Sequence, residues 1–300
     1  MARTALLLVN PSAGGGRAKR KANLVFDYLV KSGWSVELDE SSDLADLQNK
    51  VRSCNQEVLV LLAGDGSLRA AAEELVRHQK PTLLAPLPAG RGNDFCSALG
   101  ISKNLNQALL NLCTSAEVVA IDVLSINKDL IALGSISIGL DATAGAIAHS
   151  LQMSKTLKSK LLKGAPLYVY AALKALRSWQ TAPVQVSVDE GAFEDLGIWL
   201  YVVSNSGIFG GGMKISPNSG LTDGVFEIIQ VGEVSKFDFL KTLPKVFKGT
   251  HLTHPKLSMR TAYKLEISSS KNLSVFADGD PITDLPISIG ILNSALKVLK

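Results

Sequence analysis

The sequence contains few cysteines, which argues against a disulfide framework and against a cysteine-based metal site. Only Cys54, Cys96 and Cys113 occur in 300 residues, an odd number at wide spacings. Such usage suits a reducing cytoplasm. Four histidines are scattered, and the close pair His251 and His254 lies in a proline-flanked segment without cysteine or carboxylate support. We therefore expect no metal site built from histidine and cysteine ligands.

Long hydrophobic runs are also missing. No uninterrupted apolar run reaches the roughly 18 residues that a membrane-spanning helix needs. The first four residues lead directly into a predicted strand and lack the features of a signal peptide. The net charge of +4 permits anionic ligands or lipid surfaces but does not indicate nucleic acid. We expect a soluble, cytoplasmic protein that binds no nucleic acid.

Strands and helices alternate over the first 121 residues. Such alternation favours an α/β domain with a doubly wound, largely parallel sheet. Ligands bind at the carboxyl ends of the strands in such sheets, and three glycine-rich loops fall there. The predicted strands cover residues 5–9, 35–38, 58–62 and 82–87, and the predicted helices cover residues 18–32, 44–53, 67–77 and 105–113.

The pattern changes near Asp122. Two paired strands are predicted over residues 121–126 and 130–138, followed by a long helical stretch over about 143–179. Short strands then follow in series without intervening helices, which is typical of an antiparallel β-sandwich. These strands cover residues 184–188, 198–204, 225–231, 263–268 and 273–277. We therefore divide the chain into an α/β domain over 1–121 and a mainly antiparallel β-sandwich domain over 122–284.

The most informative motif joins the strand 58–62 to the helix that follows it. Its residues are Ala63, Gly64, Asp65, Gly66 and Ser67. A glycine loop between a strand and a helix N-terminus binds phosphate through backbone N–H groups and the helix dipole. Asp65 would repel bare phosphate, so its presence suggests a divalent cation between the two. A turn that needs positive φ explains the glycines but not the acid.

Two further loops have a related composition. The loop over 10–17 is rich in glycine, which allows close approach to a ligand, although an ordinary strand-to-helix turn explains it equally well. The loop over 88–95 pairs glycines with Asp94, which could also be only a helix N-cap. Three such loops at successive strand ends favour a nucleotide site. Its candidate contacts are Asn10, Pro11, Ser12, Ala13, Gly14, Gly64, Asp65, Gly66, Ser67, Gly90, Arg91, Asn93 and Asp94.

Together, these motifs resemble the diacylglycerol kinase catalytic-domain family, which includes bacterial lipid kinases and sphingosine kinases. The family's Asn-Pro start, Gly-Gly-Asp-Gly-Thr motif and Pro-x-Gly-Thr-x-Asn-Asp motif are similar to NPSAGGG, AGDGS and PAGRGND here. Residues 138–142 resemble its Gly-Phe-Asp-Ala segment, and residues 210–224 resemble its second-domain signature. Asp278-Gly279-Asp280 stands where the family has Asp-Gly-Glu. The order and spacing of these motifs carry the resemblance over nearly the whole chain.

The resemblance implies an ATP-dependent lipid kinase that transfers the γ-phosphoryl group to a lipid hydroxyl, with diacylglycerol as the first candidate. The three loops would hold ATP, and Asp65 and Asp94 would organise Mg²⁺. Asp280, or failing it Asp278, would accept the proton of the lipid hydroxyl. The second domain would receive the lipid, and residues 285–300 would return to the first domain.

The resemblance also implies a structural Mg²⁺ site in the second domain. In bacterial members of the family, an acid at the position of Asp223 binds Mg²⁺ together with two backbone carbonyls, here those of Gly220 and Val225. Oxygen ligands from a loop suit a hard cation. An Asp-Gly turn between strands is the alternative explanation.

Four residues depart from the family pattern: Ala63 replaces a glycine, Arg69 stands where asparagine is common, Arg91 replaces a threonine, and Asp280 replaces a glutamate. These departures leave open a loss or change of activity. A non-catalytic nucleotide- or lipid-binding protein on the same fold is therefore one alternative. A nicotinamide-dinucleotide kinase is another, because that family shares a Gly-Gly-Asp-Gly motif.

The stretch 155–177 mixes lysines with leucines and tyrosines. A basic amphipathic helix can lie on an anionic membrane, although such a helix more often covers a sheet. The expected partner is a membrane lipid substrate met at the bilayer surface, which allows peripheral membrane association. A homodimer is also left open.

Overall fold

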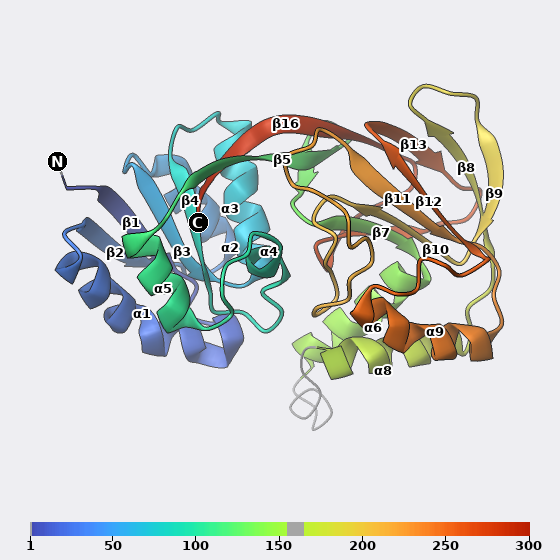
Figure 1. The fold of residues 1–300 in the computed structure, drawn as a ribbon, viewed down its shortest axis with the longest axis horizontal. Coiled ribbons are helices and arrows are strands. Elements are labelled where there is room, and N and C mark those ends of the chain that lie inside the picture. The colour runs from blue at the N-terminus through green and yellow to red at the C-terminus, as the bar shows by residue number, and fades with distance from the viewer. Residues whose placement is uncertain (1, 155–164) are drawn as a thin grey trace. The chain divides into compact units, whose positions relative to one another are not determined.

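The structure is a computed structural model that describes residues 2–154 and 165–300. It divides into two compact units (Figure 1). Unit 1 contains Met1–Asp122 and Asn293–Lys300, and unit 2 contains Val123–Leu292. No helix within the described residues is long and apolar enough to cross a membrane. Part of the basic stretch singled out in the sequence, residues 155–164, lies outside the described residues.

Unit 1 contains the expected parallel sheet. Its strands are β1 (Thr4–Val9), β2 (Ser35–Glu40), β3 (Val58–Ala63) and β4 (Leu83–Pro88). They pair in the order β2-β1-β3-β4, and all these pairs are parallel. The end of β16 (Ile287–Leu299) continues the sheet, since Val298 pairs with Leu84 in parallel. Every residue of β3 is buried, as expected of a central strand covered on both faces.

Helices cover both faces of this sheet. They are α1 (Ala13–Lys31), α2 (Leu44–Ser53), α3 (Asp65–Arg77), the short α4 (Asp94–Ala98) and α5 (Leu105–Thr114). The helices α1 and α5 share one apolar core with alternate residues of β1 and β3. Right-handed crossovers in this strand order place α2 and α3 on the opposite face (Figure 1). The doubly wound α/β fold predicted from the sequence is thus confirmed.

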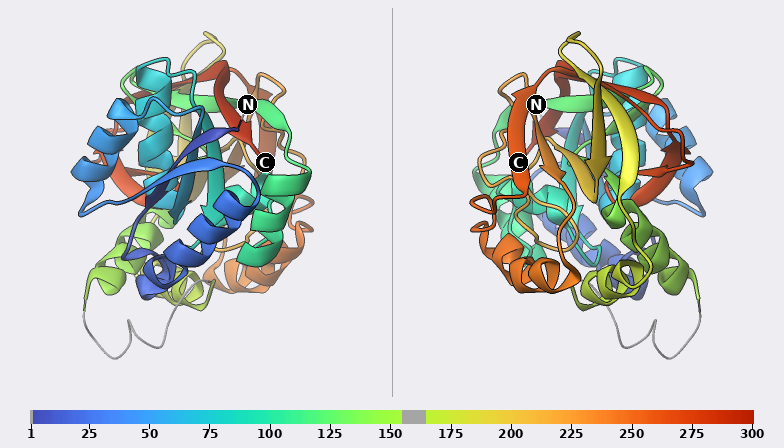
Figure 2. Two further views of the ribbon diagram at one scale, coloured as in Figure 1. Left: turned by 90° about the vertical axis from the view of Figure 1, so that its left-hand side faces the viewer. Right: turned by 90° about the vertical axis from the view of Figure 1, so that its right-hand side faces the viewer.

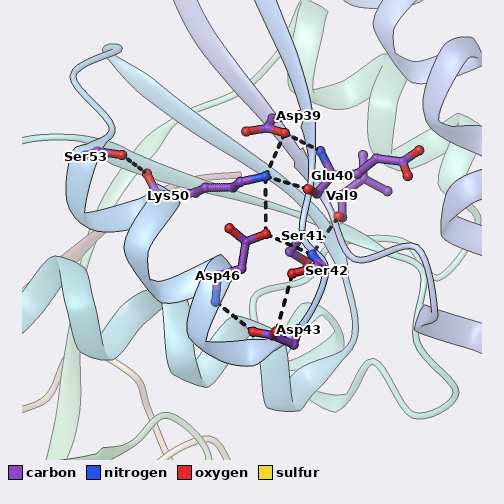
Figure 3. A network of polar contacts seen from close by, with 9 residues as sticks. All are labelled: Val9, Asp39, Glu40, Ser41, Ser42, Asp43, Asp46, Lys50 and Ser53. Atoms are coloured by element: carbon purple, nitrogen blue, oxygen red, sulfur yellow. Dashed lines mark hydrogen bonds and ion pairs between the residues drawn. The ribbon is translucent and has the colours of Figure 1, made fainter.

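A polar network holds the end of β2 beside the end of β1 (Figure 3). On α2, Lys50 Nζ donates to Asp39 Oδ1 at 2.8 Å and to the carbonyl oxygen of Glu40 at 2.6 Å. The backbone N–H of Ser41 donates to the carbonyl oxygen of Val9 at 2.9 Å. These bonds fix the chain next to the point where the first glycine loop leaves β1.

Unit 2 is a two-layered β-structure, as predicted. One sheet is antiparallel and has the order β12 (Leu257–Ala262), β11 (Phe226–Val231), β10 (Leu200–Ser204), β7 (Ser135–Gly139), β14 (Ser274–Ala277) and β15 (Asp280–Asp284). The other contains the start of β16 followed by β13 (Lys264–Ser268), β8 (Ala182–Val188) and β9 (Glu194–Ile198). The end of β5 (Val118–Ile126) also belongs to this layer, and it pairs with β6 (Leu130–Ala132). Side chains from both layers, including the fully buried Tyr201 and Phe226, form one core between them.

Helices on one side of unit 2 include one that the sequence analysis did not predict. The helices α6 (Leu140–Met153) and α8 (Ala165–Leu176) fall in the predicted helical stretch. The helix α9 (Lys236–Lys248) lies beside them in both views of Figure 2, and all three contribute to one apolar cluster. The expectation that strands follow one another here without a helix was therefore wrong. Ser235 caps α9 by accepting from Asp238 N–H, and Gly249 ends it in the left-handed region, so the helix forms despite an internal proline.

Two strand boundaries also differ from the sequence expectation. Residues 130–138 were expected to form one strand, but β6 and β7 belong to different sheets. The chain turns between them, where backbone N–H groups bond to the Asp278 carboxylate. The return to unit 1 starts at Asn293 rather than at residue 285, because Ile287–Gly290 pairs with β13 inside unit 2.

Candidate functional site

The three glycine-rich loops meet at the carboxyl ends of β1, β3 and β4 in unit 1. A Cβ on Gly14, which has φ of +60°, would overlap the carbonyl oxygen of Ala89 in the third loop. A Cβ on Gly90 would lie 2.7 Å from Gly64 Cα in the second loop. Only glycine therefore allows these backbones to approach so closely. The close approach gathers the backbone amides of three loops at one edge of the sheet.

A side-chain hydrogen bond joins the first loop to the second. Asn10 Nδ2 donates to Ser67 Oγ at 2.8 Å, and Asn10 Oδ1 accepts from the Ser12 backbone N–H and hydroxyl. Ser67 is buried, whereas Ser12 is exposed. The serine at position 67 thus keeps a structural bond through the hydroxyl that it shares with the family's threonine.

The Asp65 carboxylate joins the second loop to the third. Its Oδ2 accepts from the Asn93 backbone N–H at 2.8 Å, and its Oδ1 accepts from Phe95 N–H at 3.2 Å. Burial raises the pKa of Asp65, and the hydrogen bonds from Phe95 and Asn93 oppose that shift. A carboxylate has about four lone-pair directions, so these two bonds leave oxygen capacity for a cation.

The third loop is closed by its own asparagine. Asn93 adopts φ of +54°, and its Oδ1 accepts from Gly90 N–H at 2.8 Å. Its side chain therefore shapes the loop, and Asn93 Nδ2 also donates to the carbonyl oxygen of Gly90 at 3.3 Å. Arg91 is exposed, and Asp94 is half-buried at the start of α4.

The structure thus gathers all the sequence-predicted nucleotide contacts into these three loops and the helix starts that follow them. The departure at Arg69 lies further along α3, where Arg69 Nη1 stands 3.6 Å from Glu73 Oε2. The positive charge of Arg69 is therefore balanced by Glu73, one turn further along the same helix.

In unit 2, Asp278 is held by three consecutive backbone amides. Its Oδ2 accepts from Leu133 N–H at 2.8 Å, and its Oδ1 accepts from Gly134 and Ser135 N–H at 2.7 and 3.0 Å. Asp278 itself has φ of +51°. Three donors in one peptide run fix the carboxylate and use much of its acceptor capacity. This geometry suits a residue that positions the β14–β15 turn.

Asp280 lies two residues further along the same turn. It begins β15, is half-buried, and pairs across the strands with Ala277. Gly279, between the two acids, has φ of +88°, and a Cβ there would lie 3.1 Å from Tyr168 Oη on α8. The turn therefore lies beside the Tyr168 hydroxyl of α8, with one of the two sequence-predicted acids on each side of Gly279.

Two acids of interest were absent from the predicted site residues. Asp141 stands in the first turn of α6, and burial raises its pKa to about 6, against a hydrogen bond from Ser137. Asp122 is 2% exposed on β5, and its Oδ1 accepts from Ser294 N–H at 2.7 Å. The available signal for Asp141 was an acid two residues after a strand, at the start of a helix, a position shared with Asp65.

The three residues predicted to bind a structural cation lie together in one turn of unit 2. Asp223 Oδ1 accepts from Val225 N–H at 3.3 Å, and a Cβ on Gly220 would lie 2.8 Å from Asp223 Oδ2. The neighbouring Glu227 is buried, and burial together with the charge of Asp223 raises its pKa, while a hydrogen bond from Ser219 lowers it. Among the described residues, no cluster of three or more His, Cys, Asp or Glu side chains could hold a metal. A cation here would therefore need backbone carbonyls as ligands, with the two acids supplying charge.

The chain thus combines an α/β unit, which has glycine-rich loops at its strand ends, with a β-sandwich unit. This combination is that of a two-domain, kinase-like class of proteins. Residues 4–126 match the family model for the diacylglycerol kinase catalytic domain. Residues 134–300 match the model for the YegS C-terminal NAD kinase beta sandwich-like domain. The chain belongs to this diacylglycerol kinase-like family, as its motifs predicted.

Relatives and solved structures agree with this assignment. The chain is 25% identical over 300 residues to a diacylglycerol kinase of Mycobacterium tuberculosis, covering 98% of this chain and 94% of that protein. It is 22% identical over 301 residues to a diacylglycerol kinase of Staphylococcus carnosus, covering 99% and 95%. A crystal structure of a diacylglycerol kinase from Bacillus anthracis superimposes with a TM-score of 0.73 at 18% identity, covering 99% of this chain and 96% of that chain. The last similarity shows the shared fold.

Proposed function

We propose that this protein is an ATP-dependent lipid kinase that phosphorylates a lipid hydroxyl, with diacylglycerol as the first candidate substrate. The observation that carries the proposal is the closure of three glycine loops around Asp65, which accepts from two backbone amides of the third loop. Loops of this kind bind phosphate, and the acid inside them suits a phosphate accompanied by a divalent cation. The names of the relatives support a kinase and suggest the lipid.

The residues of unit 1 fit ATP and Mg²⁺. Gly14, Gly15 and Gly16 all have positive φ, and the Gly15 and Gly16 N–H groups donate to the carbonyl oxygen of Ser12, so this glycine turn lets a ligand approach the backbone closely. Asp65 retains oxygen lone pairs, and Asp94 starts α4 nearby in the same loop. When bound, ATP supplies the phosphoryl group and Mg²⁺ neutralises its charge. Arg91 is exposed at the tip of its loop and adds positive charge to this edge.

In the proposed reaction, a bond forms between the lipid oxygen and the γ-phosphorus, and the bond from that phosphorus to the β–γ bridging oxygen breaks. The leaving group is ADP, and the hydroxyl proton passes to a carboxylate of unit 2. The three amide bonds to Asp278 support a positioning role for that residue. Asp280 is therefore the better candidate for the proton acceptor, although it is one methylene shorter than the family's glutamate.

We also propose that Asp223 binds a structural Mg²⁺ with the carbonyl oxygens of Gly220 and Val225. The support is local: the Asp223 carboxylate faces Gly220, and the buried Glu227 adds a second negative charge to the turn. The charge of Asp223 contributes to the raised pKa of Glu227, and a cation beside the two acids would relieve this repulsion.

A nicotinamide-dinucleotide kinase is a second candidate, because the model matched by residues 134–300 describes an NAD kinase-like β-sandwich. The deciding experiment offers the full-length protein γ-labelled ATP together with diacylglycerol, other lipid alcohols, or NAD. Label in a lipid product supports the main proposal, and label in NADP supports the second. ATP binding without turnover on any acceptor would instead indicate a non-catalytic protein.

A further inference from the structure

The helix α9 packs one face against the rest of unit 2 and exposes the other face to solvent. Its half-buried residues include Phe239 and Val246; the Phe239 ring lies 6.5 Å from the Trp199 ring, and the Val246 carbonyl oxygen accepts from Lys214 N–H. At its first turn, Asp238 Oδ2 lies 2.9 Å from His254 Nε2. These contacts fasten α9 to the rest of unit 2.

The outer face of α9 carries an apolar ridge. Phe237 is 78% exposed, the highest value among the large hydrophobic side chains of the described residues, and Leu240 is 41% exposed. Pro244 is exposed on the same side. At 3.6 residues per turn, these three residues fall within about 60° around the helix axis. A ridge of this kind exposes apolar area that water solvates poorly.

Lysines border this ridge. Lys241, Lys245 and Lys248 are exposed and follow the ridge on one side of the helix, within about 80° of Phe237 around the axis. Lys236 lies on the other side, where its Nζ donates to the carbonyl oxygen of Arg177 at 2.7 Å. The helix contains a single acid, Asp238, whose side chain is 43% exposed and contacts His254, so its four lysines leave an excess of positive charge. The outer face therefore combines apolar side chains with an excess of positive charge.

We propose that the outer face of α9 binds the surface of an anionic lipid bilayer. Phe237 and Leu240 would enter the boundary between headgroups and acyl chains, while the lysines extend to the lipid phosphates. Each lysine near an anionic surface strengthens binding, so charge and apolar burial act together. This membrane binding rests on the proposed function, because a lipid kinase meets its substrate at a bilayer. This surface differs from the stretch 155–177 that the sequence suggested.

The test is vesicle sedimentation of the full-length protein without nucleotide. Vesicles of phosphatidylcholine alone are compared with vesicles that also contain phosphatidylglycerol. We expect binding only to the anionic vesicles, and weaker binding as salt concentration rises. The triple variant Lys241→Gln, Lys245→Gln, Lys248→Gln should lower the partition coefficient on the order of 100-fold. Phe237→Ser should lower it about tenfold or more.

Matched controls separate this surface from general effects. Phe193 is also exposed, at 60%, but it precedes β9 and has Glu190, Glu194 and Asp195 near it in sequence, so Phe193→Ser should bind as the parent protein does. The triple variant Lys31→Gln, Lys128→Gln, Lys271→Gln removes the same charge from exposed positions outside α9 and should retain most binding. Thermal melting of every variant checks that it is folded.

Three results would overturn the proposal: no binding of the parent protein to anionic vesicles, equal loss in the α9 and control variants, or unchanged binding in the α9 variants. Phosphorylation of a water-soluble, short-chain lipid is measured in parallel. Lost vesicle binding with unchanged turnover of that substrate places the defect at the membrane surface. Vesicle binding that depends on α9, without any lipid phosphorylation, would leave this proposal standing and reject the kinase proposal.

Discussion

Asp65 and Asn93 are 28 residues apart in the chain, yet Asp65 Oδ2 accepts the Asn93 backbone N–H at 2.8 Å. This bond joins the loop after β3 to the loop after β4. The acid that most strongly suggested a cation in the sequence therefore also holds the site together. A substitution at Asp65 can therefore act through cation binding or through the bond between the two loops, and both have to be measured.

Replacing Asp65 by asparagine should remove most kinase turnover. The amide keeps one acceptor oxygen, so the fold should survive while one of the bonds to Asn93 and Phe95 is lost. We expect a loss of stability of about 1–3 kcal/mol, measured by denaturant unfolding. Turnover is measured with lipid and saturating ATP. A near-native rate in a folded variant would show that Asp65 has no role in catalysis.

Asp278 and Asp280 should respond differently to removal of charge. Asp280→Asn should slow turnover by roughly 10²–10⁴ at saturating ATP, the usual range for general acid–base catalysis, while ATP binding is retained. Asp278→Asn should mainly lower stability, because an amide cannot accept all three N–H bonds from Leu133, Gly134 and Ser135. Rates and unfolding curves of both variants decide between them. If Asp278→Asn alone abolishes turnover without destabilising the protein, the roles are reversed.

Asp141 should make stability depend on pH. Burial raises its pKa from 3.8 to about 6, so the folded state binds its proton more tightly than the unfolded state. This tighter proton binding stabilises the folded state fully below pH 3.8, and the stabilisation is lost as pH rises through about 6. Asp141→Asn should therefore change the free energy of unfolding more favourably at pH 7 than at pH 4. The difference should be at most about 3 kcal/mol.

The comparison uses unfolding free energies of parent and variant at both pH values, so that other titrating groups cancel. Asp284→Asn, at an exposed position on β15, serves as the control and should show no such difference. A stability difference between parent and Asp141→Asn that is the same at both pH values would contradict a raised pKa of Asp141 in the folded state.

Chelation should lower the melting temperature if Asp223 binds a structural cation. A ligand that binds only the folded state stabilises it by mass action, and its removal reverses the effect. Asp223→Ala should melt at the same temperature with and without chelator, whereas the control Asp284→Ala should keep the parent's sensitivity. Adding Mg²⁺ back should restore the parent. Identical melting of the parent protein in both conditions would leave Asp223 as a turn residue only.

The sequence alone determined the parts of the molecule that depend on local patterns. The buried run 58–62, the glycines and acid after it, and the helical spacing beyond it identify a strand, a loop and a helix without any distant contact. The same is true of the other two loops, and their order along the chain was sufficient for the family. Glycine and apolar periodicity act within a few residues, so they can be read from a linear chain.

Tertiary structure alone decided which groups these residues meet. Asp278 is more than 140 residues from the amides of Leu133–Ser135 that hold it, and no local pattern indicates that pairing. The helix α9 contains Pro244, which argues against a helix locally, and it forms because its caps and its packing against Trp199 outweigh that cost. Its exposed ridge exists only because the sheet covers the opposite face. Long-range pairing and burial depend on the folded chain as a whole, and for that reason the sequence located the loops but not their partners.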